Sequence, residues 1–159
     1  MLTSANLLQS LGFTVHFVKS QLEPKQIAEF LGFVIDSVRM TVSLPEEKKT
    51  KILLLIGSVL SREDVRIRDV ASLIGNFVSS FPGSMYGPLY YRNIEMDKDR
   101  ALKRNRGNYD AFMILSEEAH SEITWWKTNI PTMTGPVAWP PITEEISADA
   151  AGKNGCGAM

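Results

Sequence analysis

The stretch RDVASLIGNFVSSFPGSMYGPLYYRNIE, residues 68–95, begins with a regular helical pattern. Apolar residues there and just before it recur at steps of three and four, as on one face of a helix: Ile67, Val70, Ala71, Ile74, Phe77, Val78 and Phe81. Pro82-Gly83 is expected to end this helix. A further helix is expected to start near Pro88 and to end in a basic tail at Arg106. We interpret the apolar face as the packing surface of a helical bundle, not as a substrate site.

The segments on either side of this stretch also have helical patterns. Before it, Pro45 is expected in a first helical turn, followed by two glutamates and a face made of Ile52, Leu55, Ile56, Val59 and Leu60. After it, Ser116 is expected as an N-cap, with an apolar stripe made of Ala119, Ile123, Trp126 and Ile130. Adjacent residues of a helix cannot both face one core, so Trp125 or Trp126 is expected to be half-exposed.

The N-terminal part predicts strands instead. Residues 30–35 form a β-rich run, Asp36-Ser37 supplies a turn, and residues 39–44 alternate polar and apolar side chains, so a hairpin with one buried face is expected. Residues 14–18 have a short strand pattern. Before them, three leucines at helical spacing precede Gly12, which predicts the end of a helix. The expected fold class is therefore α+β.

Composition limits the classes of function. The chain has 159 residues, 44% of them hydrophobic, 22% charged, and a formal net charge of -1, which is globular and gives no overall sign of a nucleic-acid partner. The single cysteine, Cys156, excludes an internal disulfide, and His16 and His120 are too few for a zinc site. No signal peptide or membrane-spanning segment is recognisable, so an intracellular location (cytoplasm or nucleus) and no membrane partner are expected.

A family resemblance begins with Leu11-Gly12-Phe13, Lys19-Ser20 and EFLGFVI at residues 29–35. These resemble the last palm motifs of retrotransposon reverse transcriptases, in which such a hairpin is the primer grip. The resemblance assigns the grip to Phe30, Leu31, Gly32 and Phe33, and makes Lys19 an auxiliary catalytic cation. The alternatives are a plain hairpin with a glycine for packing and a solvated lysine at a strand end.

Residues 68–95, together with SLPEEK at residues 43–48 and YDAFMILSEEAHSEITWWKTNI at residues 109–130, resemble the thumb and connection of DIRS-type elements. These are retrotransposons that integrate through a tyrosine recombinase. The resemblance implies a palm end at residues 1–44, a helical thumb and connection at 45–130, a proline-rich linker at 131–145 and a ribonuclease H start at 146–159.

The basic tail of the helix expected to end at Arg106 is a candidate phosphate-binding surface. The resemblance assigns nucleic-acid binding to Arg92, Lys98, Arg100, Lys103, Arg104 and Arg106. The alternative is a solvated helix end whose cations suit the negative end of the helix dipole. Tyr90 and Tyr91 are explained equally well by a nucleic-acid groove and by burial.

The last residues, ISADAAGKNGCGAM at 146–159, resemble the first strand and glycine-rich turn of ribonuclease H. The resemblance makes Asp149 the first metal-binding carboxylate of that domain. A two-metal site needs several converging carboxylates, which one aspartate cannot supply. The alternative is a turn aspartate followed by glycines.

No Asp-Asp pair occurs in the sequence, whereas the family polymerises nucleotides with Mg²⁺ held by palm aspartates. The chain is therefore expected to be a fragment of an RNA-directed DNA polymerase that grips an RNA–DNA or DNA template-primer duplex. The rest of the palm, the fingers and the ribonuclease H domain would lie in the parent protein, and the fragment alone would be inactive and would not bind Mg²⁺ tightly. The rivals are a host-domesticated nucleic-acid-binding module and a relic without selected function.

Overall fold

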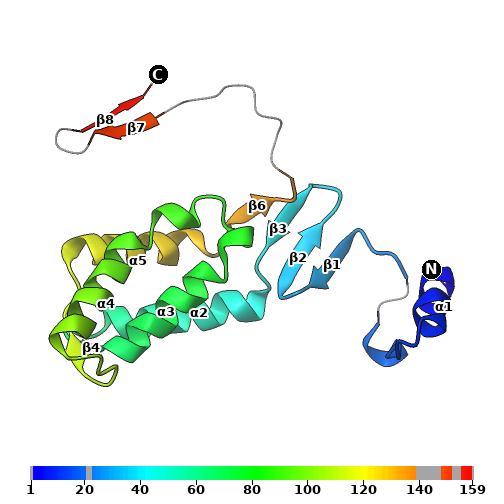
Figure 1. The fold of residues 1–159 in the computed structure, drawn as a ribbon, viewed down its shortest axis with the longest axis horizontal. Helices are drawn as coiled ribbons and strands as arrows, with labels where there is room; N and C mark the ends of the chain where they lie inside the picture. The colour runs from blue at the N-terminus through cyan, green and yellow to red at the C-terminus, as the bar shows by residue number, and fades with distance from the viewer. Residues whose placement is uncertain (1, 21–22, 139–147, 152–154, 159) are drawn as a thin grey trace.

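The computed structural model describes residues 2–20, 23–138, 148–151 and 155–158. It has an α+β fold, as predicted (Figure 1). The α-helices are α1 (Leu2–Ser10), α2 (Glu46–Leu60), α3 (Ile67–Val78), α4 (Arg92–Arg104) and α5 (Glu117–Asn129). Short 3-10 helices are η1 (Phe17–Lys19), η2 (Phe81–Gly83) and η3 (Gly87–Leu89). No helix of the described residues is long and apolar enough to cross a membrane.

The strands form three separate antiparallel sheets. The largest has the order β1-β2-β3-β6, made of β1 (Ile27–Phe30), β2 (Phe33–Asp36), β3 (Thr41–Ser43) and β6 (Thr134–Pro136). A two-stranded ribbon joins β4 (Val65–Arg66) to β5 (Phe112–Met113). The third pairs β7 (Ala148–Ala151) with β8 (Gly155–Ala158), so a strand is present where one was expected near the C-terminus, and the expected turn lies outside the described residues.

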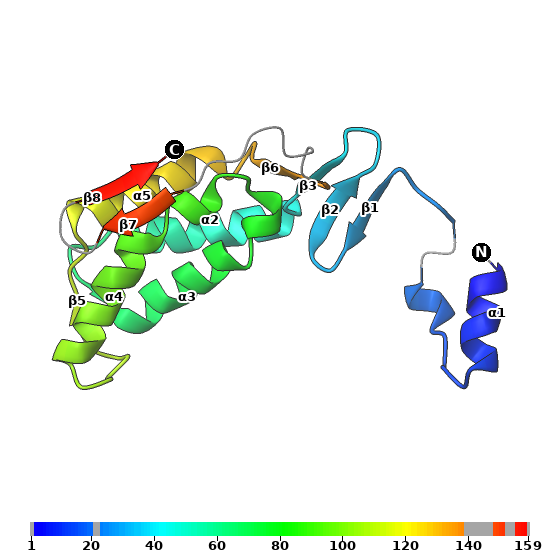
Figure 2. The ribbon, with the colours of Figure 1, turned by 45° about the horizontal axis from the view of Figure 1, so that its top comes forward.

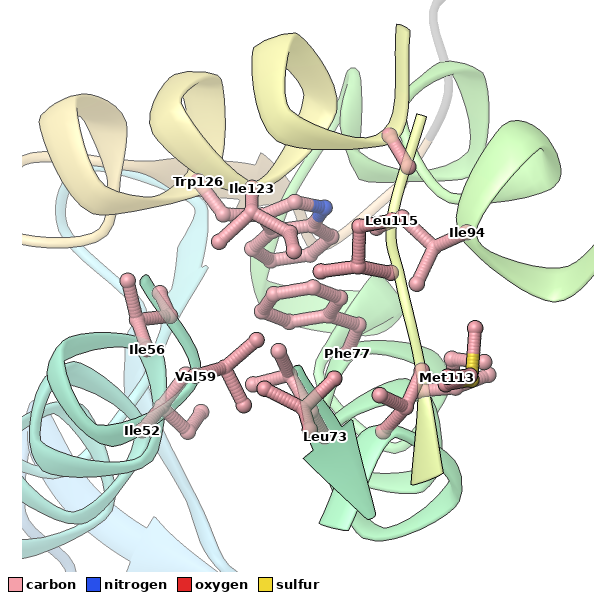
Figure 3. Close-up of a cluster of buried hydrophobic side chains, with 14 of the residues drawn as sticks. Ile52, Ile56, Val59, Leu73, Phe77, Ile94, Met113, Leu115, Ile123 and Trp126 are labelled. Carbon is pink, nitrogen blue, oxygen red and sulfur yellow. The ribbon is translucent and has the colours of Figure 1, made fainter. Parts of the chain in front are cut away.

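Helices α2 to α5 pack together into a four-helix unit, here called the helical body, in which each helix packs on two others (Figures 1 and 2). At its centre the indole of Trp126 stacks on the ring of Phe77, with centroids 4.3 Å apart and planes 6° apart. Residues from all four helices surround this pair (Figure 3): Ile52, Ile56, Val59, Leu73, Ile94 and Ile123. The indole Nε1 donates to the Tyr90 carbonyl oxygen at 2.7 Å, so the polar atom of this buried side chain is satisfied.

The apolar patterns predicted for α2 and α5 are confirmed as core faces, and that of α3 is confirmed in part: Val78 is 44% exposed, and Leu73, which the predicted face omitted, is fully buried. The whole predicted stripe of α5 is buried, and the Ser116 hydroxyl caps that helix by accepting from Ala119 N at 3.2 Å. The expectation for the tryptophan pair is also confirmed, since Trp126 is fully buried and Trp125 is half-buried against the Tyr90 ring. The end of α1 agrees with its prediction as well: Gly12 has φ 88° and donates to the Gln9 carbonyl oxygen.

The hairpin predicted for residues 30–44 is present as β2 and β3, which pair antiparallel. Its first strand is shorter than predicted, because Leu31 and Gly32 form an additional turn between β1 and β2. The predicted turn begins at Asp36, whose carboxylate accepts from the backbone N–H groups of Val38 and Arg39 at 2.9 Å. No residue of β1 or β2 is fully buried, so this sheet lacks the single buried face that was expected.

Residues 14–18 do not form the predicted strand. Their last two residues lie in η1, where Ser20 N donates to the Phe17 carbonyl oxygen and the Ser20 hydroxyl donates to that of His16. A strand needs a neighbour for its hydrogen bonds. Here the carbonyl oxygens of His16 and Phe17 accept from Ser20 instead, and Lys19 is the last residue of a 3-10 helix rather than of a strand.

The helix predicted from Pro88 to Arg106 begins later, at Arg92. Pro88 lies in η3, where the chain passes tightly against Trp126: a Cβ on Gly87 would lie 2.7 Å from an indole carbon. Likewise, α3 ends at Val78, so Phe81 belongs to η2. The bulky tryptophan therefore shapes the connection that the sequence pattern assigned to regular helix.

The segment expected as a linker, residues 131–145, contains strand β6. Thr134–Pro136 pairs with β3, with Gly135 opposite Val42. The expectation for residues 139–145 lies outside the described residues. Because β6 follows α5 and pairs with β3, which precedes α2, the small sheet joins the segments of the chain that enter and leave the helical body.

We predict that Gly135→Ala lowers the free energy of unfolding by about 1–3 kcal/mol, because its Cβ would overlap the Pro82 carbonyl oxygen. The matched control is Gly57→Ala in α2, where a Cβ meets nothing within 4 Å. That change removes a helix glycine and should stabilise by about 0.5–1 kcal/mol. Urea unfolding followed by circular dichroism measures both. Equal stability of the two variants would contradict the close approach of β6 to η2.

Candidate nucleic-acid interface

The turn between β1 and β2 exposes two large apolar side chains. Phe30 and Phe33 are directly opposite each other in the ladder, and the two residues between them, Leu31 and Gly32, have φ of 50° and 75°. Two positive φ values are typical of a type I′ hairpin turn, which favours Asn, Asp or Gly. Leu31 is 81% exposed and Phe30 is 61% exposed.

Leucine is unfavourable in this turn for two reasons. A left-handed backbone costs about 1–2 kcal/mol for a residue with a Cβ, and the exposed side chain gains nothing from burial. Strain of this kind that is maintained without a packing benefit occurs preferentially at functional sites. The tip of this hairpin, Phe30-Leu31-Gly32-Phe33, is therefore the first candidate surface.

Lys48 connects the hairpin to the helical body. Its Nζ lies 4.8 Å from the centroid of the Phe33 ring and donates to the Ser79 carbonyl oxygen, at the end of α3, at 2.9 Å. Burial, and after it the charge of Lys51, lowers the pKa of the Lys48 ammonium. The contact on Phe33 is a cation–π interaction, so one side chain of α2 positions both the hairpin and the end of α3.

The predicted nucleic-acid-binding cations differ in their availability. Three of them are ion-paired: Arg92 to Glu95 at 2.7 Å, Lys98 to Asp99 at 3.1 Å, and Arg100 to Asp97 at 3.6 Å. Within residues 2–20, 23–138, 148–151 and 155–158, no ion pair is formed by Lys103, Arg104 or Arg106. These three exposed cations lie at the end of α4, which stops where Gly107, at φ 82°, donates to the Leu102 carbonyl oxygen.

The start of α4 is fixed by Glu122, a residue whose role the sequence patterns did not reveal. The carboxylate, in a residue only 6% exposed, accepts from Asn93 N at 3.1 Å, from Ile94 N at 3.1 Å and from Asn93 Nδ2 at 2.8 Å. These backbone N–H groups are donors that a helix start leaves without partners. The signal was present, because position 122 lies three residues after Ala119 and four before Trp126, on the predicted apolar stripe of α5.

Arg68 and Asp110 form an ion pair on the surface beside the β4–β5 ribbon. The Arg68 guanidinium donates to both carboxylate oxygens of Asp110, at 3.0 and 3.2 Å. These hydrogen bonds, reinforced by the charges, hold the pKa of the Asp110 carboxyl below its ordinary value and raise that of Arg68. Both side chains are well exposed, so the pair orients the loop more than it stabilises the fold.

The structure does not bring all the predicted site residues together. The β1–β2 hairpin and the end of α4 lie at opposite ends of the helical body (Figures 1 and 2). Lys19 lies in η1, and Asp149 lies in β7, opposite Gly157. Among the residues the structure describes, no three His, Cys, Asp or Glu side chains are grouped as a metal site would require. Only an elongated ligand would contact both the hairpin tip and the basic end.

Comparison with known proteins adds no relative. The sequence matches no protein-family model, and neither a search of curated proteins nor a search of solved structures finds a match.

Proposed function

We propose that this chain is the primer-grip, thumb and connection region of a retrotransposon-type RNA-directed DNA polymerase, and that it binds a template-primer duplex. The observation that carries the proposal is the hairpin tip, where an exposed leucine occupies a turn position that disfavours it. In the reverse transcriptases that the chain resembles, the corresponding hairpin contacts the 3′ end of the primer. An apolar, non-reactive tip is suited to hold a sugar-phosphate terminus in place rather than to act on it.

The basic end of α4 supports the same proposal. Lys103, Arg104 and Arg106 are suited to contacts with the phosphate backbone of a nucleic acid, which do not depend on base sequence. A duplex is long and uniformly charged, so it can reach both the hairpin and α4 without those two surfaces meeting. Mg²⁺ would serve the parent enzyme elsewhere, since the polymerase aspartates of the family have no counterpart in these residues.

Leu31→Asn tests the proposal, because its effects on stability and on binding are expected to have opposite signs. Asparagine tolerates the positive φ, so the free energy of unfolding should rise by about 0.5–1 kcal/mol. Loss of the apolar contact with the primer should weaken binding on the order of tenfold. Urea unfolding measures the first, and fluorescence anisotropy with a labelled RNA–DNA hybrid measures the second.

The matched control is Met40→Asn, which replaces an apolar side chain that is 53% exposed, at φ 54°, in the other turn of the same sheet. It should leave the affinity for the hybrid unchanged. If Leu31→Asn binds the hybrid as tightly as the wild type, the hairpin tip is not a nucleic-acid contact and the proposed grip is wrong.

A further inference from the structure

A cleft of about 470 Å³ lies between the second half of α4 and the β4–β5 ribbon. Arg100, Arg104 and Asn105 line it from α4, and Phe112 and Ile114 line it from β5 and the residue after it. Its size is within the range of small-molecule sites. The core residues Ala101 and Met113 also line it, but the hairpin tip contributes no residue, so the cleft is separate from the grip.

One wall of the cleft is an exposed apolar surface that the strand geometry creates. Met113 points into the core and is 6% exposed, so its neighbours Phe112 and Ile114 point to the opposite face. They are 52% and 77% exposed. The Arg66 guanidinium lies 5.7 Å from the centroid of the Phe112 ring. An exposed phenyl ring beside a cleft is a surface on which a flat aromatic ligand can stack.

The balance of charges in the cleft suits an uncharged nucleobase better than a phosphate group. Two arginines, Arg100 and Arg104, are balanced by two aspartates, Asp64 and Asp97. Asp97 is partly engaged already, because its Oδ2 accepts from Ser116 N at 2.8 Å. The Asn105 Nδ2 donates to the Ala101 carbonyl oxygen at 2.9 Å, which leaves its Oδ1 as an acceptor. The lining thus offers both donors and acceptors without net charge, which matches the edge of a nucleobase.

We propose that this cleft binds one unpaired nucleobase of a single-stranded nucleic acid, stacked on Phe112 with its edge toward Arg104 and Asn105. The inference rests in part on the proposed function, because a duplex held at the basic end of α4 would present its single-stranded extension here. Stacking of bases on aromatic side chains is tolerant of sequence. The cleft therefore distinguishes unpaired from paired nucleic acid, not one sequence from another.

The test compares a labelled RNA–DNA hybrid that has a single-stranded template extension with the same hybrid made blunt. By fluorescence anisotropy the full chain should bind the extended hybrid about fivefold more tightly or better. This gain should change little with salt, because a base contact releases no counterions. Phe112→Leu, which keeps an apolar side chain but removes the ring, should abolish the gain. Tyr109→Leu, an exposed aromatic outside the cleft, should preserve it.

Ile114→Ala, at the other apolar position of the wall, provides a second variant and should reduce the gain. If the wild type binds the blunt and the extended hybrid with equal affinity, the cleft is not a nucleobase site, and the proposed binding of a duplex stands. If a labelled single strand binds in a Phe112-dependent way but the duplex does not bind, the cleft stands and the proposed duplex function fails. Wild-type affinity of Phe112→Leu for every probe would overturn the base site.

Discussion

Glu122→Ala is expected to lower the free energy of unfolding by about 3 kcal/mol, the largest loss we predict for a single polar side chain. The carboxylate accepts from two backbone N–H groups and one amide at the start of α4. Its removal leaves these donors without partners in a buried position, at about 1–3 kcal/mol for such a group. It also removes a negative charge from the positive end of a helix dipole. Urea unfolding monitored by circular dichroism gives the value.

Two comparisons separate the capping effect from a general effect of shortening a glutamate in α5. Glu118→Ala changes an exposed residue on the same helix and should cost less than about 1 kcal/mol. Glu122→Gln keeps the shape and one good acceptor, so it should fall between the two. A Glu122→Ala protein within about 1 kcal/mol of the wild type would mean that α4 does not depend on this cap.

The second large effect concerns binding. Replacing Lys103, Arg104 and Arg106 together by glutamine should weaken binding to an RNA–DNA hybrid about a hundredfold at low salt. The slope of log affinity against log salt should become shallower by about 2–3, since each phosphate contact contributes about 0.9. These residues are chosen because no ion pair engages them within the described part of the chain, so their charge is available to a ligand. Anisotropy titrations at several salt concentrations measure both quantities.

The charge-matched control replaces three other exposed lysines, Lys25, Lys51 and Lys127, by glutamine. It removes the same charge from elsewhere on the molecule, so it tests whether position matters. A similar loss in both triple variants would indicate nonspecific attraction to the whole chain and would contradict a surface at the end of α4.

The sequence predicted the elements whose signal is local. The stripe of α5 and the faces of α2 and α3 follow helical periodicity, and they pack as their patterns indicate except at α3, where Leu73 is buried in place of Val78. The Ser116 cap was equally readable, because a hydroxyl and the N–H that it satisfies lie three residues apart in the chain. Local repetition over a dozen residues is enough to specify such helices.

The elements that depend on distant partners were not predictable in the same way. Strand β6 is three residues long and contains glycine and proline; only its pairing with β3 and the close approach of Gly135 to Pro82 make it a strand. Residues 14–18 have an alternating pattern but pair with no strand in the described part of the chain. Short strands take their conformation from neighbours, which a single sequence pattern does not reveal.

The candidate site likewise has features that the sequence predicts and features that only the structure reveals. The hairpin tip was predicted from the family resemblance, but the positive φ of Leu31 and the contacts of Lys48 with Phe33 and Ser79 were visible only in the structure. Six nucleic-acid-binding cations were predicted, Arg92 and the five of the basic tail, and within the described part of the chain three of them form ion pairs and three form none. A choice among neighbouring charges depends on side-chain geometry, which composition cannot supply.

Photo-crosslinking from the primer end tests the central claim most directly. A hybrid carrying 4-thiothymidine at the 3′ end of the primer is bound, irradiated and digested, and the crosslinked peptide is identified by mass spectrometry. Crosslinks are expected at Phe30, Leu31, Gly32 or Phe33, and they should be lost when unlabelled hybrid competes. Crosslinks confined to other segments while the hybrid is bound would contradict the assignment of this hairpin as a primer grip.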